Sequence, residues 1–463
     1  MASEKKSTRK ARRVTFILGG VILAVAAIFI VTLAVDKFEA SPPRFELTPP
    51  VESIGVTHTL QGLALDEGSG LKKLWIAILQ GQNEVVLLDK TFESNGWLGE
   101  GTVHKYDVSL PIDIKDHKLS HGAAILRVNL SDYSYRRWWE GNRTYEEFPI
   151  VIDTVPPEIT VLSRQHNLNQ GGSGLVVYAL SEPVSSTGIW VGDRFFDGQT
   201  GYFSQPDRYI AFFALPHTMG PQTQLYVSAT DQAGNMSKRG ISYYINEKVF
   251  PKDTLYISDR FLRQKMPEFD SLSLPGPPAD SPLDKFLVVN RDLRAANYKT
   301  VQKVCEKSDP KKYWTGSFTR LPRSARKAAF ADRRSYVYNG KTVDNQLHLG
   351  VDLASTARSP VPASNTGRVC FADSLGIYGK TVIIDHGFSL FSMYGHLSRV
   401  NVVPDQMVTR GDIIGLTGTT GMAGGDHLHF SMLVHHTFVN PIEWWDENWI
   451  NHNITDKLTR LTQ

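Results

Sequence analysis

Two histidines one residue apart, His427 and His429, follow a pair of glycines in the stretch GGDHLHFSML (424–433). In an extended strand successive side chains point to opposite faces, so both imidazoles would lie on one face and Leu428 on the other. Two imidazoles on one face can bind a common metal ion. The same pattern also fits ordinary residues of a half-exposed strand, so the metal interpretation needs further ligands elsewhere.

Further candidate ligands lie upstream. The sequence HLGVD places His348 and Asp352 four residues apart, and MYGHLS supplies His396. A hydrolytic zinc site needs about three protein ligands, drawn from imidazole and carboxylate, and an open position for water. The sequence contains no HExxH motif, so the glutamate base of helical zinc peptidases is absent and a histidine would have to carry the proton.

In this order the motifs resemble the lysostaphin-like family of zinc metallopeptidases, also called the M23 or LytM-type family. The resemblance covers residues 313–446, close to 30% of the chain, and is carried by HLGVDLA, GKTVIIDHG, MYGHLSRVNV, VTRGDIIGLTGTTG, DHLHF and VNPIEW. It implies a C-terminal antiparallel β-sheet domain that hydrolyses peptide cross-links of bacterial peptidoglycan.

The resemblance also implies a role for each candidate residue. His348, Asp352 and His429 would bind one zinc ion per chain, whereas His396 and His427 would stay unligated and face the water and the scissile carbonyl. Zinc lowers the pKa of a bound water towards ~7, where a nearby histidine can take or return a proton.

Several other residues in this region are given lesser roles. Ser431 stands where the family often has glutamate, so the support of the histidine ligand is expected to differ. In VVPDQMV (402–408), Asp405 lies near the usual glycine position and is expected to tolerate a left-handed turn. His386 is predicted to make a local hydrogen bond. His435 and His436 are predicted to face solvent, with a place in a substrate cleft as the less favoured alternative.

The amino terminus predicts a membrane anchor. Residues 1–13 carry six basic side chains against one glutamate, and residues 14–35 contain no charge. About 20 apolar residues span a bilayer as a helix, and the basic flank is expected to stay in the cytoplasm. The prediction is a single-pass inner-membrane protein whose bulk is periplasmic. The alternative is a long cleaved signal with a poor cleavage site at 38–40.

The remaining sequence predicts a mainly β protein. Short runs typical of β-strands are separated by turn residues, and they form two similar copies of about 100 residues each. These copies resemble bacterial immunoglobulin-like modules. We therefore expect two β-sandwich modules at 45–153 and 154–250, which would act as a spacer or bind envelope proteins. A partly helical connector is expected at 251–312, and a C-terminal tail at 447–463.

Composition excludes some functions. The chain of 463 residues has 50 basic and 47 acidic residues. Its net charge of +3 does not indicate the basic surface expected of a nucleic-acid-binding protein. Cys305 and Cys370 do not form a zinc knuckle, and the sequence leaves open whether they form a disulfide or stay free. The glycine-rich stretch 415–426 lacks the GK[ST] ending of a phosphate loop and fits turns around a peptide groove better.

The sequence thus predicts a membrane-anchored zinc endopeptidase. Two alternatives remain: a non-catalytic envelope protein that activates another hydrolase or scaffolds an assembly, and a peptidase held latent by the connector. The five filled catalytic positions favour an enzyme.

Overall fold

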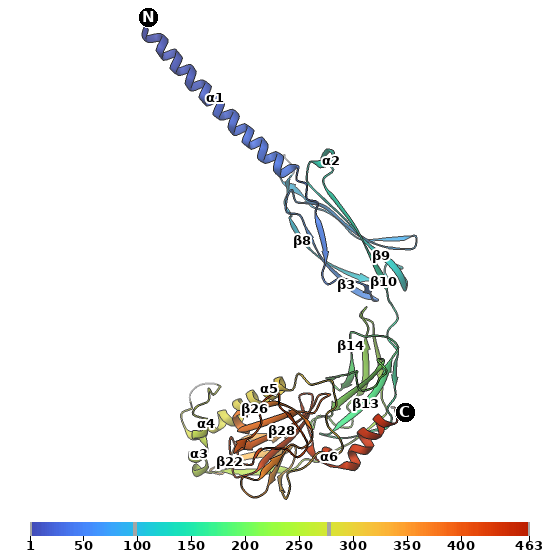
Figure 1. Ribbon diagram of the computed structural model, residues 1–463, viewed down its shortest axis with the longest axis vertical. Coiled ribbons are helices and arrows are strands. Elements are labelled where there is room, and N and C mark those ends of the chain that lie inside the picture. Colours follow the sequence, from blue (N-terminus) through green and yellow to red (C-terminus); the bar gives the residue numbers. More distant parts are fainter. Residues whose placement is uncertain (1, 96–99, 276–278, 462–463) are drawn as a thin grey trace. The chain divides into compact units, whose positions relative to one another are not determined.

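The computed structural model describes residues 2–95, 100–275 and 279–461. Backbone contacts divide the chain into two compact units, Met1–Pro156 with Asp231–Asn235 and Pro157–Thr230 with Met236–Gln463. Strands outnumber helices in both units, as the mainly β prediction requires (Figure 1).

The first unit begins with helix α1 (Ala2–Lys37). The predicted membrane span at residues 14–35 lies within this helix, but the side chains of residues 14 and 32–35 fall outside the described part of the chain. Over the residues whose side chains are described, no helix has both the length and the apolar character needed to cross a membrane. The structure therefore gives the predicted span no support.

A two-sheet β-sandwich forms the rest of the first unit. Alternate residues of its longest strand, among them Leu126, Val128 and Leu130, are buried in the core, as expected for strands with one face inward. One sheet contains β1 (Arg44–Leu47), β3 (Thr57–Leu65) and β8 (Lys105–Asp113). The other contains β2 (Ser53–Ile54), β10 (Arg143–Ile152), β9 (Gly122–Asp132), β4 (Leu71–Gln80) and β5 (Asn83–Thr91). The short elements are β6 (Ser94–Asn95), β7 (Glu100–Gly101) and α2 (Arg136–Trp139).

The second unit opens with another all-β module built from three small sheets. The first has β11 (Ile159–Val161), β13 (Ser173–Leu180) and β16 (Arg208–Ala214). The second has β12 (His166–Asn169) and β19 (Tyr243–Asn246). The third has β15 (Arg194–Asp197), β14 (Ser186–Val191), β17 (Leu225–Thr230) and β18 (Met236–Gly240).

This second module shares its core with the C-terminal region. The ring of Phe212 lies 6.4 Å from the rings of both Trp314 and Trp444, measured between centroids. The buried carboxylate of Glu443 accepts hydrogen bonds from the Ser173 backbone N–H (2.9 Å) and from Asn169 Nδ2 (2.8 Å). One continuous apolar core therefore includes residues of both the second module and the C-terminal region. A module packed in this way does not fit the predicted role of an independent spacer.

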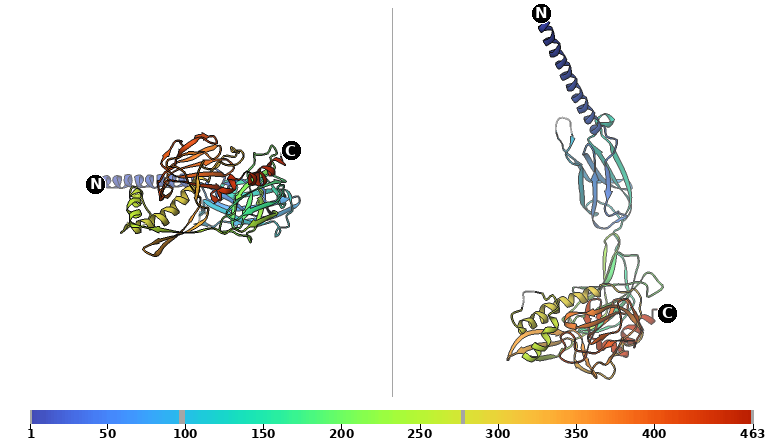
Figure 2. Two further views of the ribbon diagram at one scale, coloured as in Figure 1. Left: turned by 90° about the horizontal axis from the view of Figure 1, so that it is seen from below. Right: turned by 60° about the vertical axis from the view of Figure 1, so that its left-hand side comes forward.

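The connector is partly helical, and it also contains a strand that the sequence analysis did not predict. Strand β20 (Lys252–Ile257) pairs in parallel with β22 (Asp332–Tyr338), which pairs with β23 (Lys341–His348). Ser258 and Ser281 cap the next helices by accepting hydrogen bonds from backbone N–H groups. These helices lie along one side of the C-terminal strands (Figure 2); they are α3 (Asp259–Lys265), α4 (Pro282–Val288) and α5 (Arg294–Val304), with η1 (Met266–Phe269) and η2 (Val289–Leu293) between them.

An eight-stranded antiparallel sheet forms the centre of the C-terminal region. Its central strands β28 (Leu390–Leu397) and β32 (Leu428–Val434) are fully buried, and β27 (Lys380–Asp385) is buried except at Lys380. The sheet contains β21 (Ala325–Ala328), β24 (Val351–Ala354), β32 (Leu428–Val434), β28 (Leu390–Leu397), β27 (Lys380–Asp385), β26 (Gly367–Ser374), β30 (Met407–Val408) and β33 (Thr437–Val439). A smaller sheet contains β25 (Pro360–Pro362), β31 (Ile413–Leu416) and β29 (Arg399–Val400), and η3 (Gly376–Tyr378) precedes β27.

The predicted C-terminal tail at 447–463 is largely helical. Ile450, Ile454 and Leu458 recur at a spacing of four residues, which places them on one helical face, and all three are buried. The helices are α6 (Pro441–Trp445), α7 (Glu447–Ile450), η4 (Asn451–Thr455) and α8 (Asp456–Thr459). Packing against the second module, through bonds such as Lys457 Nζ to the Leu175 carbonyl (3.3 Å), therefore orders this segment.

Candidate metal centre

Strand register places two of the predicted metal ligands on one face of the sheet. Asp352 on β24 is the direct cross-strand partner of His429 on β32, so the two side chains point the same way. His427 lies two residues before His429 and shares that face. His348 reaches the same point from the end of β23.

The three predicted ligand atoms converge on one point. His348 Nε2 lies 2.9 Å from Asp352 Oδ1 and 2.9 Å from His429 Nδ1, and His429 Nδ1 lies 3.0 Å from Asp352 Oδ1. All three residues are buried. Three potential ligand atoms so close together are the arrangement expected of a site that binds a divalent ion.

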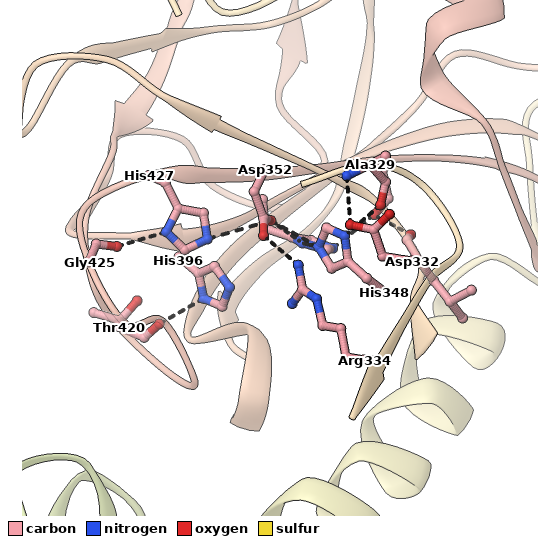
Figure 3. A network of polar contacts seen from close by, with 12 residues as sticks. Ala329, Asp332, Arg334, His348, Asp352, His396, Thr420, Gly425 and His427 are labelled. Carbon is pink, nitrogen blue, oxygen red and sulfur yellow. Dashed lines mark hydrogen bonds and ion pairs between the residues drawn. The ribbon is translucent and has the colours of Figure 1, made fainter. Parts of the chain in front are cut away.

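Hydrogen bonds fix which nitrogen of each histidine faces the common point (Figure 3). His348 Nδ1–H donates to the Ala329 carbonyl (2.9 Å), which leaves the Nε2 lone pair directed at Asp352. His429 Nε2–H donates to Ser431 Oγ (3.1 Å), and that hydroxyl donates to the Leu349 carbonyl (2.8 Å). Two imidazole lone pairs and a carboxylate oxygen therefore face one position, and this donor set fits zinc.

The glycine of the HLGVD motif makes room for this packing. A Cβ at Gly350 would lie 2.6 Å from both His429 Nε2 and Ser431 Oγ, closer than Cβ atoms approach other heavy atoms. Any side chain at this position would displace the histidine ligand, so glycine is required between the two upstream ligands.

An arginine that the sequence analysis did not single out holds the second carboxylate oxygen. Arg334 on β22 donates from its guanidinium to Asp352 Oδ2 at 3.0 Å, while Oδ1 faces the histidines. The two oxygens of Asp352 therefore have different partners, the Arg334 guanidinium at Oδ2 and the two histidines at Oδ1 (Figure 3). The available signal was the position of Arg334 on the same strand face as Tyr336 and Tyr338, but it did not indicate a partner.

His396 reaches the site through a β-bulge. Gly395 pairs with His429, so regular alternation would place His396 on the far face, but the register between β27 and β28 slips here. His396 has φ +61°, in the left-handed region, which re-aims its side chain. The centroid of its ring then lies 4.8 Å from that of His427.

Both unligated histidines are oriented by backbone carbonyls. His396 Nδ1–H donates to the Thr420 carbonyl (2.8 Å) and His427 Nδ1–H to the Gly425 carbonyl (2.7 Å). Each ring therefore keeps Nε2 for the cavity, and His427 Nε2 lies 3.5 Å from Asp352 Oδ1.

Their surroundings displace the two pKa values in opposite directions. Burial, together with the neighbouring imidazoles, holds the pKa of His396 well below its usual value. Burial also opposes the charged form of His427, but the hydrogen bond and charge of Asp352 outweigh it and raise the pKa of His427. The lowered pKa favours the neutral form of His396 and the raised pKa favours the protonated form of His427, the pairing expected for acid–base work.

A cavity of about 400 Å³ opens onto this cluster. Its wall includes Met422 and Gly424 of the glycine-rich stretch, which was predicted to border a peptide groove. The connector supplies the opposite wall, through residues that the sequence analysis had not placed near the site: Asp253, Leu255, Tyr256, Ile257, Phe261, Phe286 and Arg294.

The remaining predicted residues have structural positions. His386 bonds the Thr366 carbonyl (2.8 Å) and Ser392 Oγ (2.7 Å), as predicted. Asp405 adopts φ +66°, the expected left-handed turn. His435 is not solvent-facing as predicted but half-buried, with its ring 5.4 Å from that of Phe196 between centroids. Neither His435 nor the exposed His436 lines the cavity.

The two cysteines do not form a disulfide. Cys305 is buried, Cys370 is half-buried, and both thiols are free.

Replacing Ser431 by alanine is expected to weaken metal binding. The change removes the acceptor of the His429 Nε2–H bond, and loss of such support lowers metal affinity about 10–100-fold. Competition with a chromophoric chelator measures the affinity. Ser374→Ala, an exposed change on β26 of the same sheet, is the control. Equal affinities for the two variants would show that the Ser431 hydroxyl does not support the ligand.

Comparison with known proteins agrees with the geometry. Residues 346–441 match the family model "Peptidase family M23". The DD-carboxypeptidase/endopeptidase Mpg of Neisseria meningitidis serogroup B is 36% identical over 97 residues, which are 21% of this chain and 22% of that protein. The peptidoglycan DD-endopeptidase ShyA of Vibrio cholerae is 38% identical over 96 residues, again 21% of this chain and 22% of that protein.

The solved catalytic domain of lysostaphin from Staphylococcus simulans is 27% identical, covers 28% of this chain and 96% of that domain, and has a TM-score of 0.24. The matched segment is about a fifth of the length of these curated relatives. The chain therefore contains an M23 peptidase domain at residues 346–441, and the family resemblance noted in the sequence is confirmed.

Proposed function

We propose that this chain is a zinc endopeptidase that hydrolyses peptide cross-links of bacterial peptidoglycan. The observation that carries the proposal is the convergence of His348 Nε2, Asp352 Oδ1 and His429 Nδ1 within 3.0 Å of one another. Two further histidines, His396 and His427, line the cavity that opens onto these three residues. The names of the relatives, which are peptidoglycan DD-endopeptidases, support the substrate class.

The side chains divide the work between them. When bound, zinc supplies Lewis acidity that makes a water nucleophilic and polarises the scissile carbonyl. His396 Nε2 accepts the proton of the attacking water, because Nδ1–H donates to the Thr420 carbonyl and the lowered pKa favours the neutral ring. His427, whose raised pKa favours the protonated ring, donates a hydrogen bond to the oxyanion. It then transfers that proton to the leaving amine. Arg334 keeps Asp352 oriented throughout.

Digestion of purified peptidoglycan tests this function. The full chain loaded with zinc is expected to release fragments that carry new amino termini at cross-link peptides, identified by mass spectrometry. A chelator should stop the release and added zinc should restore it. A protein that holds a full equivalent of zinc and releases no peptide would contradict the proposal and favour the non-catalytic alternative.

We further propose that residues 14–35 anchor the chain in the inner membrane, with residues 1–13 in the cytoplasm and the rest in the periplasm. Support comes from the uncharged run and from its exposed side chains, since Phe16 is 78% and Leu23 72% exposed. The first sandwich, at 45–153, would then be the spacer between membrane and wall.

Cell fractionation tests the anchor. The full chain is expected to stay with membranes through an alkaline carbonate wash, whereas residues 37–463 fused to a cleavable signal peptide should be recovered in the soluble periplasmic fraction. Release of the full chain by the wash would rule out a spanning helix.

A further inference from the structure

A second and larger cavity lies beside the metal centre. It measures about 840 Å³, within the usual range of about 300–1,000 Å³ for ligand sites. The connector helices η2 and α5 form one side, and Leu349 with the sheet of β20, β22 and β23 forms much of the other. Arg294, Arg334 and Tyr378 line both this cavity and the one that opens onto the metal ligands. The two cavities are therefore adjacent and share these three lining residues.

This second cavity, here called the basic cavity, has a one-sided charge. Of the fifteen residues that line it, six are cationic and none is acidic. The six are Lys252, Arg291, Arg294, Lys299, Arg333 and Arg334. The charges of the whole chain almost cancel, so this concentration is local. Like charges that share a concave wall repel one another, and their combined potential attracts an anion.

Most of these cations have no anionic partner among the residues that the structure describes. Arg291 pairs with Asp344 (2.9 Å) and Arg334 with Asp352 (3.0 Å). Arg294 donates only to neutral acceptors, the carbonyl and side-chain oxygens of Asn290. Within the described residues, Lys252, Lys299 and Arg333 form no ion pair. Arg334 Nε is also buried without a hydrogen-bond partner in that part of the chain. Donor capacity is therefore left over at the boundary between the two cavities.

We propose that the basic cavity binds carboxylate groups of the substrate peptide on one side of the scissile bond. The inference rests on the proposed function, because peptidoglycan cross-link peptides carry free carboxylates. A peptide with its scissile carbonyl at the metal ligands extends past Arg334 and Arg294 into this cavity. Guanidinium groups bind carboxylates through two parallel hydrogen bonds, which adds geometric selectivity.

The rest of the lining favours a peptide over a bare inorganic anion. Leu347, Leu349, Ala295 and the ring of Tyr298 lie among the cations, so aliphatic segments of a peptide find apolar contacts between its carboxylates. An inorganic phosphate would leave this apolar wall without contacts. The cavity therefore sets substrate specificity through charge and contributes little to bond cleavage itself.

Paired substrates test the inference on the full chain. One is a cross-linked peptide with free carboxylates, and the other is the same peptide with those carboxylates amidated. Lys299→Gln and Arg333→Gln alter exposed side chains that touch neither the metal ligands nor His396 and His427. We expect each change to raise KM for the acidic peptide about threefold, and the double change about tenfold, as for exposed charge pairs. KM for the amidated peptide and kcat for both should stay unchanged.

Matched controls are Lys303→Gln, on the same helix α5, and Lys341→Gln, on β23, because both lysines are exposed outside the cavity. Equal KM values for acidic and amidated peptides in the unchanged protein would overturn the inference while leaving the peptidase function intact. Inorganic phosphate that competes as strongly as the acidic peptide would also overturn it.

A binding assay separates the two failures. Fluorescence anisotropy of a labelled acidic peptide reports binding without turnover. Binding that depends on Lys299 and Arg333, with no cleavage of any peptide, would support the basic cavity and refute the proposed hydrolysis.

Discussion

Replacing His429 by alanine is expected to remove bound zinc and to abolish peptidoglycan hydrolysis. The imidazole supplies one of three donors that lie 2.9–3.0 Å apart, and two donors leave a divalent ion weakly held. Since a metal ion contributes several kcal/mol to transition-state stabilisation, activity should fall at least about a thousandfold. Elemental analysis of the dialysed protein gives the zinc content, and a peptide-release assay gives the rate. His348→Ala and Asp352→Ala should behave alike.

The control for this experiment is His436→Ala, because His436 lies in the same hairpin, is exposed and does not line the cavity. It should keep a full equivalent of zinc and the original rate. A His429→Ala protein that still holds a full equivalent of zinc, with a normal thermal unfolding curve, would refute the ligand assignment.

Replacing His427 or His396 by alanine should separate metal binding from turnover. Neither ring belongs to the three-donor cluster, so zinc should be retained. Proton transfer by a positioned histidine contributes about 10²–10⁴-fold, and kcat should fall by that amount with little change in KM. Steady-state kinetics on protein of measured zinc content gives both constants. Added imidazole should recover part of the lost rate by entering the space left by the ring.

The two variants should also differ in stability. His396 is buried within a β-bulge, whereas His427 lies at the edge of the cavity, so His396→Ala is the more destabilising change. His427→Ala is therefore the cleaner test of chemistry. A His427→Ala protein with the original kcat would exclude this histidine from proton transfer.

Much of the candidate site follows from local sequence. The order HxxxD, YGHL and HLHF supplies two imidazoles and a carboxylate with a further pair of histidines, and the alternation of a strand places His427 and His429 on one face. The mainly β character follows from the same alternation in strands such as β9. The alternation depends on near neighbours along the chain, whereas the grouping of residues as distant as His348 and His429 came from the family resemblance.

Other features depend on contacts between distant segments. Regular alternation would turn His396 away from the site, and only the bulge opposite β27 brings it back. The bond from His429 Nε2 to Ser431 leaves Nδ1 as the candidate ligand atom, and no rule of sequence spacing predicts which nitrogen that is. Arg334 meets Asp352 because β22 is placed against the site by the connector strand β20.

The sequence, through its resemblance to the M23 family, therefore implied which side chains form the candidate metal centre and that strands carry them. The tertiary structure decided the orientation of these side chains. It also decided that the second module and the peptidase domain share a core, and that six cationic side chains line the basic cavity. Periodicity reports which face of its own element a residue occupies. Partners across a sheet, a bulge or a packed helix are chosen by hydrogen-bond direction and burial among segments that lie far apart along the chain.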